Sequence, residues 1–148
     1  MKVRCIKLVS LEGKELASSP WLKLDGVYDV LSFTAGLNRG VLLRILDEKS
    51  AGLFPLQQFE IVDGTIPTSW RATALPTGDI SFGPQSWREP GFWERYFDGN
   101  EEARKIFDEE CRAMGAIAPD KHVGAGTHGY EVQTKRLYGN GCVFSFQL

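Results

Sequence analysis

Histidine and cysteine are the side chains best suited to catalysis or metal binding, and this chain holds few of them. The histidines are His122 and His128, which five residues separate, and Asp120 is the acid close to them. Paired metal ligands usually have helical spacing or Cys and carboxylate companions. The surrounding HVGAGTHG also lacks the Lys-Ser/Thr of a phosphate-binding loop. We interpret both histidines as residues of a glycine-rich loop and expect no metal or cofactor.

Three cysteines, Cys5, Cys111 and Cys142, are widely spaced and form no C-x-x-C motif. A nucleophile could combine Cys142 or Cys111 with His128. A reactive thiolate needs a helix N-terminus or a cationic neighbour, whereas Cys111 falls on the apolar stripe of an expected helix and Cys142 in an apolar strand. Both settings raise a thiol pKa. We therefore expect reduced, mostly buried thiols in a protein that is not an enzyme. A small hydrolase using His128 with Cys142 or a carboxylate is the alternative.

The densest group of aromatic and acidic side chains lies between residues 87 and 102. Its aromatic members at 92–97 fall in two adjacent rows at i, i+4 spacing, too many to bury on one short helix. A glycosidase-like acid pair needs spacing across a cleft, and acids at a helix start have a capping role. Core packing is the first interpretation of such a group, and a protein interface is the alternative, because Trp and Tyr beside charges anchor interfaces. The candidate partner-binding residues are Trp87, Glu89, Trp93, Glu94, Asp98, Glu101 and Glu102.

Short apolar segments joined by turns predict the elements of the first part of the chain. Alternating or β-branched runs at 2–9, 27–33 and 41–47 predict strands, the last buried on most of both faces. Residues 53–62 predict two short strands, or a strand with one helical turn. This pattern is typical of a small SH3-like β-barrel over residues 1–66.

Residues 67–148 predict an α/β extension packed on the barrel as one compact unit. Two strands flank the turn at 76–78, and two short helical turns follow within 84–99. The main helix is expected at 100–114, with Asn100 as N-cap and Gly115 just beyond its C-terminus. A C-terminal hairpin joins YEVQTKRLY to CVFSFQL. The expected fold class is therefore α+β.

Composition narrows the choice of partner. The net charge is −2, and Lys and Arg are dispersed rather than gathered in a basic stripe, so the sequence does not favour nucleic acid. The first 15 residues interrupt every apolar run with charges, which does not fit a signal peptide. No run approaches the roughly 20 apolar residues that cross a bilayer. We expect a cytoplasmic protein without a membrane partner.

Two segments, LFPLQQFEIVDGTIPTSW (53–70) and EPGFWERYFDGNEEARKIFDEE (89–110), together resemble the immunity proteins encoded beside polymorphic toxins of contact-dependent or type VI secretion systems. In that group a short barrel ending in an FE-V-G-IP-W stretch precedes a PGFWE-YF-G helical segment. With the preceding strands, the resemblance covers about two thirds of the chain. It implies a non-enzymatic inhibitor, or antitoxin, that binds a cognate secreted toxin and blocks its active site or substrate access.

Many such toxins are nucleases with basic clefts, which an acidic, aromatic-edged surface would complement. A second hypothesis is an SH3-like module that binds a peptide or nucleic acid through loop aromatics, here Tyr28 or Phe33. Exposure of these two rings in a groove, with the 87–97 group buried, would favour the second hypothesis.

Overall fold

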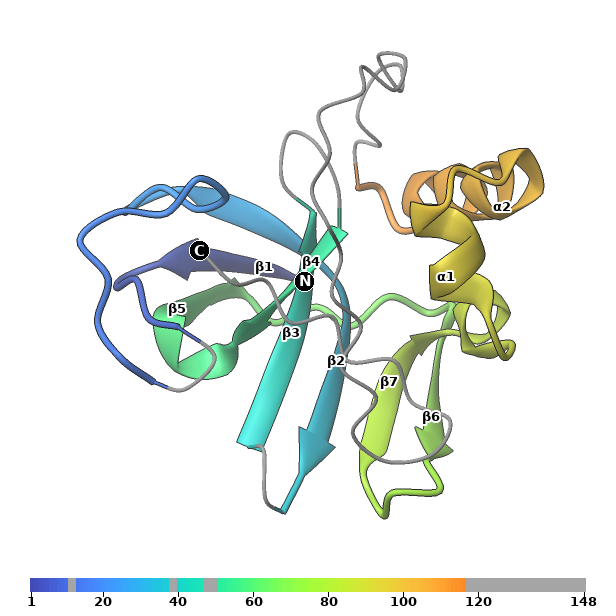
Figure 1. Cartoon of the computed structure of the whole chain (residues 1–148), viewed down its shortest axis with the longest axis horizontal. Helices are drawn as coiled ribbons and strands as arrows, with labels where there is room; N and C mark the ends of the chain where they lie inside the picture. The colour runs from blue at the N-terminus through green and yellow to red at the C-terminus, as the bar shows by residue number, and fades with distance from the viewer. Residues whose placement is uncertain (11–12, 38–39, 47–50, 117–148) are drawn as a thin grey trace.

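The computed structural model describes residues 1–10, 13–37, 40–46 and 51–116. Over these ranges the chain is an α+β fold in which one antiparallel sheet is covered on one side by a small helical unit (Figure 1). The strands are β1 (Lys2–Cys5), β2 (Val27–Gly36), β3 (Gly40–Leu46), β4 (Ala51–Pro55), β5 (Phe59–Asp63), β6 (Trp70–Ala74) and β7 (Ile80–Pro84). A 3-10 turn, η1 (Leu56–Gln58), separates β4 from β5.

The sheet branches at its longest strand, β2. Five strands follow the order β4-β3-β2-β1-β5. Strand β7 also pairs with β2, and β6 pairs with β7. The N-terminal end of β2 pairs with β1, and residues 33–35 pair with β7, with an irregular register between Val30 and Ser32 in the pairing with β3. A bulge of this kind bends the strand, so β2 can pair with β1 near its N-terminal end and with β7 further along.

The expected closed SH3-like barrel is not what the described strands form. Among these residues β4 pairs only with β3, and β5 pairs only with β1, so both are sheet edges. The predicted strands themselves are largely confirmed, including a strand, a 3-10 turn and a second strand within 53–62. The sheet does not close into the expected barrel, because the later part of β2 pairs with β7 instead. Since β7 hydrogen-bonds to β2, residues 70–84 extend the sheet formed by residues 1–66.

The helical unit consists of η2 (Gln85–Arg88), α1 (Phe92–Phe97) and α2 (Glu101–Ala113). The prediction of α2 is confirmed together with its signals. Asn100 accepts a hydrogen bond from the Ala103 N–H at 3.0 Å, and Gly115 takes a φ of 69°, which a residue with a Cβ adopts only with strain. The expected C-terminal hairpin and the glycine-rich loop lie outside the described residues.

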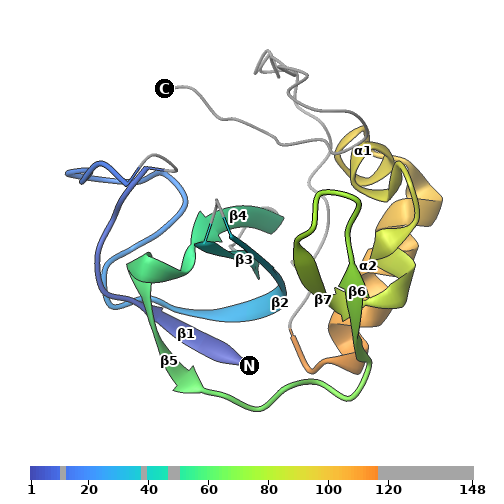
Figure 2. The same ribbon diagram turned by 90° about the horizontal axis from the view of Figure 1, so that it is seen from below.

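Two apolar clusters lie on opposite sides of the β2–β3 pair. Val30, Leu43 and Ile45 belong to the cluster enclosed by the strands, whereas Leu31 and Leu46 belong to the cluster under the helices. The prediction that β3 is buried on both faces is therefore confirmed. Figure 2 shows α1 and α2 beside β6 and β7, on the opposite side from β1 and β5. Trp70 links the clusters, since its indole N–H donates to the Met114 sulfur at 2.9 Å. The described residues hold no helix long and apolar enough to cross a membrane.

Candidate protein-binding surface

The aromatic side chains of η2 and α1 mainly build the core between the helices and the sheet. Trp87, Phe92, Tyr96 and Phe107 are each at most 5% exposed. The rings of Tyr96 and Phe107 lie 4.5 Å apart, and those of Trp87 and Phe107 stack at 5.2 Å. Trp93 is half-buried, and Phe97 is 37% exposed. Most of this group is therefore packed inward, with one edge left at the surface.

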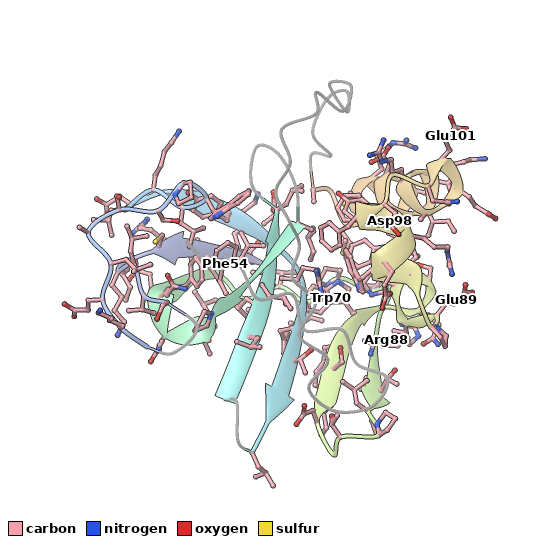
Figure 3. The ribbon with its side chains drawn as sticks, in the orientation of Figure 1. Phe54, Trp70, Arg88, Glu89, Asp98 and Glu101 are labelled. Carbon is pink, nitrogen blue, oxygen red and sulfur yellow. The ribbon has the colours of Figure 1, made fainter. Side chains whose placement is uncertain are left out.

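The seven candidate residues separate by burial. Trp87 is a core residue at 4% exposure, so it offers no contact surface. Trp93 and Glu94 are half-buried, and the remaining four acids are exposed. We call the five acids the acidic helical face: Glu89, Glu94, Asp98, Glu101 and Glu102. Figure 3 shows Glu89 and Glu101 at the outer side of the helical unit, away from the sheet.

Between described residues, one ion pair involves the acidic helical face. Glu89 lies 3.7 Å from Arg95, a weak, solvent-exposed pair. None of the ion pairs between described residues includes Asp98, Glu101 or Glu102. Glu101 and Glu102 occupy the first turn of α2, where the helix dipole favours negative charge. The same acids can therefore stabilise the helix and present a negative surface.

One charged side chain lies beneath this surface and was missed in the sequence. Arg44 of β3 is 9% exposed, and its guanidinium carbon lies 3.6 Å from the centre of the Trp93 ring. Burial lowers the pKa of Arg44 to about 9, partly opposed by Tyr96, so the side chain remains charged at neutral pH. The Trp93 face compensates the cation by a cation–π contact. The sequence does carry a signal for this residue, because Arg44 is a charge inside the otherwise apolar run VLLRIL.

Comparisons of the chain with protein-family models, with curated proteins and with solved structures find no match.

The described cysteines sit in apolar surroundings. Cys5 and Cys111 are free and buried. Burial, with smaller contributions from Asp108 and Glu110, raises the pKa of the Cys111 thiol to about 12, and burial also raises the pKa of Cys5. Both thiols are therefore protonated and poorly nucleophilic at neutral pH. His122, His128 and Cys142 lie outside the described residues. Within those residues, no group of three or more His, Cys, Asp or Glu could hold a metal ion.

The raised pKa of Cys111 gives a pH-dependent stability. The pKa of the thiol is about 9 in the unfolded chain and about 12 in the folded protein. Its contribution to the free energy of unfolding is therefore intact below pH 9 and is lost as the pH rises toward 12. We expect the stability difference between the protein and Cys111→Ala to shrink by about 2–3 kcal/mol between about pH 8 and pH 11. Urea unfolding at each pH measures it. A difference that stays constant would show that the thiol ionises normally in the fold.

The aromatic residues of the SH3-like hypothesis are partly packed. Tyr28 is half-buried, and its hydroxyl accepts a hydrogen bond from the Lys23 N–H at 2.8 Å. Phe33 is half-buried, stacks on Phe82 at 4.7 Å and meets the edge of Trp70 at 5.8 Å. These rings pack against the apolar cluster that the strands enclose, so they support the sheet. The acidic helical face is the more accessible of the two predicted surfaces.

Proposed function

We propose that this protein is an immunity-type inhibitor that acts in the cytoplasm by binding a cognate bacterial toxin and covering its active site or substrate access. The observation that carries the proposal is the acidic helical face, whose Asp98, Glu101 and Glu102 are exposed and outside the ion pairs of the described residues. The resemblance of residues 53–70 and 89–110 to immunity proteins supports the same class.

A partner with a basic cleft would match this surface. Negative charges held on a short, packed helical unit keep their positions, so they steer a basic partner into one orientation without ordering a loop. The buried aromatic cluster gives the acids this rigid support. A toxin that acts on nucleic acid has a basic cleft because its substrate is anionic, so a nuclease is the toxin class that fits.

The test uses the product of the adjacent reading frame as the toxin. The protein should copurify with it and should restore growth to cells that produce it. We expect Glu94→Lys/Glu101→Lys to slow association about tenfold at low salt, and less than about twofold at 0.5 M salt, because salt screens the steering field. Stopped-flow or surface-based kinetics would measure the rate constants.

A matched control separates steering from net charge. Glu15→Lys/Glu60→Lys makes the same change of charge at exposed positions of the N-terminal loop and β5, so its association rate should stay within about twofold. Absence of binding and protection would refute the proposed function. Binding with an unchanged association rate in Glu94→Lys/Glu101→Lys would instead place the contact on another surface.

A further inference from the structure

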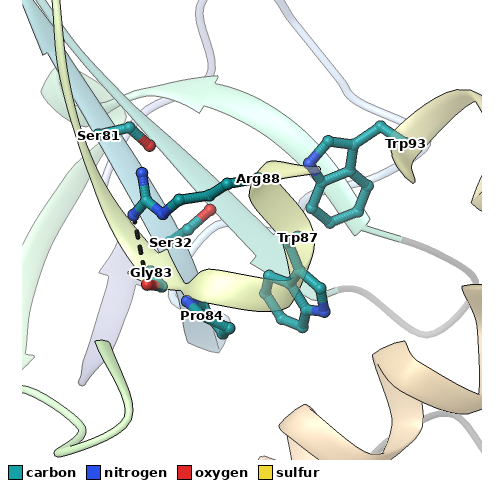
Figure 4. A pocket seen from close by; sticks show the side chains of 7 residues that line it. All are labelled: Ser32, Ser81, Gly83, Pro84, Trp87, Arg88 and Trp93. Carbon is teal, nitrogen blue, oxygen red and sulfur yellow. Dashed lines mark hydrogen bonds between the residues drawn. The ribbon is translucent and has the colours of Figure 1, made fainter. Parts of the chain in front are cut away.

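A small cavity lies where η2 meets the branch point of the sheet. It measures about 30 Å³, and its lining residues are Ser32, Ser81, Gly83, Pro84, Trp87, Arg88 and Trp93 (Figure 4). A cavity needs about 10–15 Å³ to hold one water molecule, so this one has room for two or three waters or for one group of about three or four heavy atoms. Ser32, Ser81, Arg88 and Trp93 are half-buried, which places the cavity near the surface.

The guanidinium of Arg88 is the main polar group of this cavity. Its Nη2 donates to the carbonyl oxygens of Arg71 at 2.6 Å and Gly83 at 3.2 Å. These bonds hold the side chain in place between β6, β7 and η2. Its Nε and Nη1 atoms are buried and have no hydrogen-bond partner among the described residues. A buried N–H of a charged group that makes no hydrogen bond costs free energy of folding. An acceptor bound in the cavity would remove this cost.

The surroundings of the cavity are cationic. None of the ion pairs between described residues includes Arg88 or Arg44. Arg44 lies over the ring of Trp93, which lines the cavity, and Ser32 is the cross-strand neighbour of Arg44. Burial also lowers the pKa of Arg88, the direction expected when no counter-charge compensates desolvation. In a protein whose net charge is −2, this local positive field favours an anion.

Glycine at position 83 makes the close approach of β7 to β2 possible. A Cβ at Gly83 would lie 2.6 Å from the Ser32 Cβ, too close for any side chain. The hydroxyls of Ser32 and Ser81 are thereby brought to the same cavity as Arg88. Trp87 and Trp93 add apolar walls. The site therefore combines charged donors, hydroxyls and aromatic surface in a small space.

We propose that this cavity binds the carboxylate of a small organic acid of about the size of formate or acetate, with the Ser32 hydroxyl and one unpartnered N–H of Arg88, that of Nε or that of Nη1, as donors. One carboxylate oxygen would accept from Arg88 and the other from Ser32, and a methyl group of acetate would contact the indole rings. Phosphate and sulfate carry five heavy atoms and exceed the volume. The carboxylate can belong to a free acid or to an acidic side chain of a protein, and the test distinguishes these sources.

The experiment titrates the folded protein with sodium formate, acetate, phosphate or chloride at constant ionic strength. The Arg88 Nε–H and Trp93 indole N–H signals are followed by proton–nitrogen NMR. We expect saturable shifts with formate and acetate, and at least about tenfold weaker effects with phosphate and chloride. N-acetyl-aspartate amide serves as the side-chain arm: binding equal to acetate assigns a protein source, and binding of the free acids alone assigns a small molecule. Equal shifts with chloride would overturn the proposal, because they would report nonspecific anion binding or bound water rather than a carboxylate site.

Variants make the result specific to the cavity. Arg88→Lys keeps the charge but loses the Nε and Nη1 donors, and it should weaken acetate binding at least about tenfold, read from the Trp93 signal. Arg71→Lys is the matched control, since Arg71 is exposed and its side chain donates to Thr68 and Trp70 rather than into the cavity. Acetate affinity should be unchanged there. If Arg88→Lys does not fold, Ser32→Ala/Ser81→Ala decides: a severalfold loss supports the site, and unchanged affinity refutes it.

Discussion

Phe107→Ala is expected to lower the free energy of unfolding by about 3–5 kcal/mol. Phe107 is fully buried in α2 and lies at the centre of the helical cluster, with its ring 5.2 Å from Trp87 and 4.5 Å from Tyr96. Truncation removes the contact that joins α2 to both η2 and α1. The surrounding rings also pack on Phe92 and Trp93, so they cannot collapse fully into the space that is left.

Urea unfolding measures this loss, with Leu37→Ala as the control. Leu37 is a large apolar residue whose side chain is fully exposed at the turn after β2. Its removal should change stability by less than about 0.5 kcal/mol. A loss below about 1.5 kcal/mol for Phe107→Ala would mean that the helical unit contributes little to the cooperative fold. The acidic helical face would then lack the rigid support on which steering depends.

Local signals made the elements predictable. The helix α2 shows its stripe of Ala103, Phe107 and Cys111 in the sequence, with Asn100 and Gly115 marking its ends, and all three stripe residues are buried. The strands and the turn between β6 and β7 follow from alternation and turn residues in the same way. These features depend on neighbours within a few residues, so a single sequence carries them.

Pairing between distant segments was harder to predict. Whether the sheet closes into a barrel depends on which strands pair with β2. The bulge near Leu31, which bends β2, is not marked by a turn residue in the sequence. The aromatic group is unusual in the sequence, but its division into a buried majority and a half-buried Trp93 depends on where α1 packs. The cavity of Arg88 likewise requires β7 to approach β2 at Gly83, a contact between residues about 50 positions apart.

The pair of Arg44 and Trp93 should show a large energetic coupling. Trp93→Leu removes the aromatic face that lies 3.6 Å from the buried guanidinium, and we expect a loss of about 3 kcal/mol. About 2 kcal/mol of this is the desolvated cation–π contact, and the remainder is lost ring packing. Arg44→Met replaces the buried cation with an apolar chain of similar length, which in other buried ion sites is close to neutral.

The decisive measurement is a double-mutant cycle of these two substitutions by urea unfolding. In the Arg44→Met background, Trp93→Leu should cost only about 1 kcal/mol, which leaves a coupling of about 2 kcal/mol. The coupling should persist at 0.5 M salt, because a buried pair is poorly screened. Arg4→Met is the control: Arg4 pairs with Glu60 at 2.7 Å with both side chains about half exposed, and its loss should cost less than about 1 kcal/mol.

A coupling below about 0.5 kcal/mol would show that other groups compensate the Arg44 charge. A coupling near 2 kcal/mol would show that β3 holds α1 in place through one cation and one ring. That contact links the cavity of Arg88 to the acidic helical face, since Trp93 lines the cavity and directly precedes Glu94. Loosening it should therefore weaken acetate binding in the cavity and, through the mobility of α1, slow association with a basic partner. Both effects can be measured in the same Trp93→Leu protein.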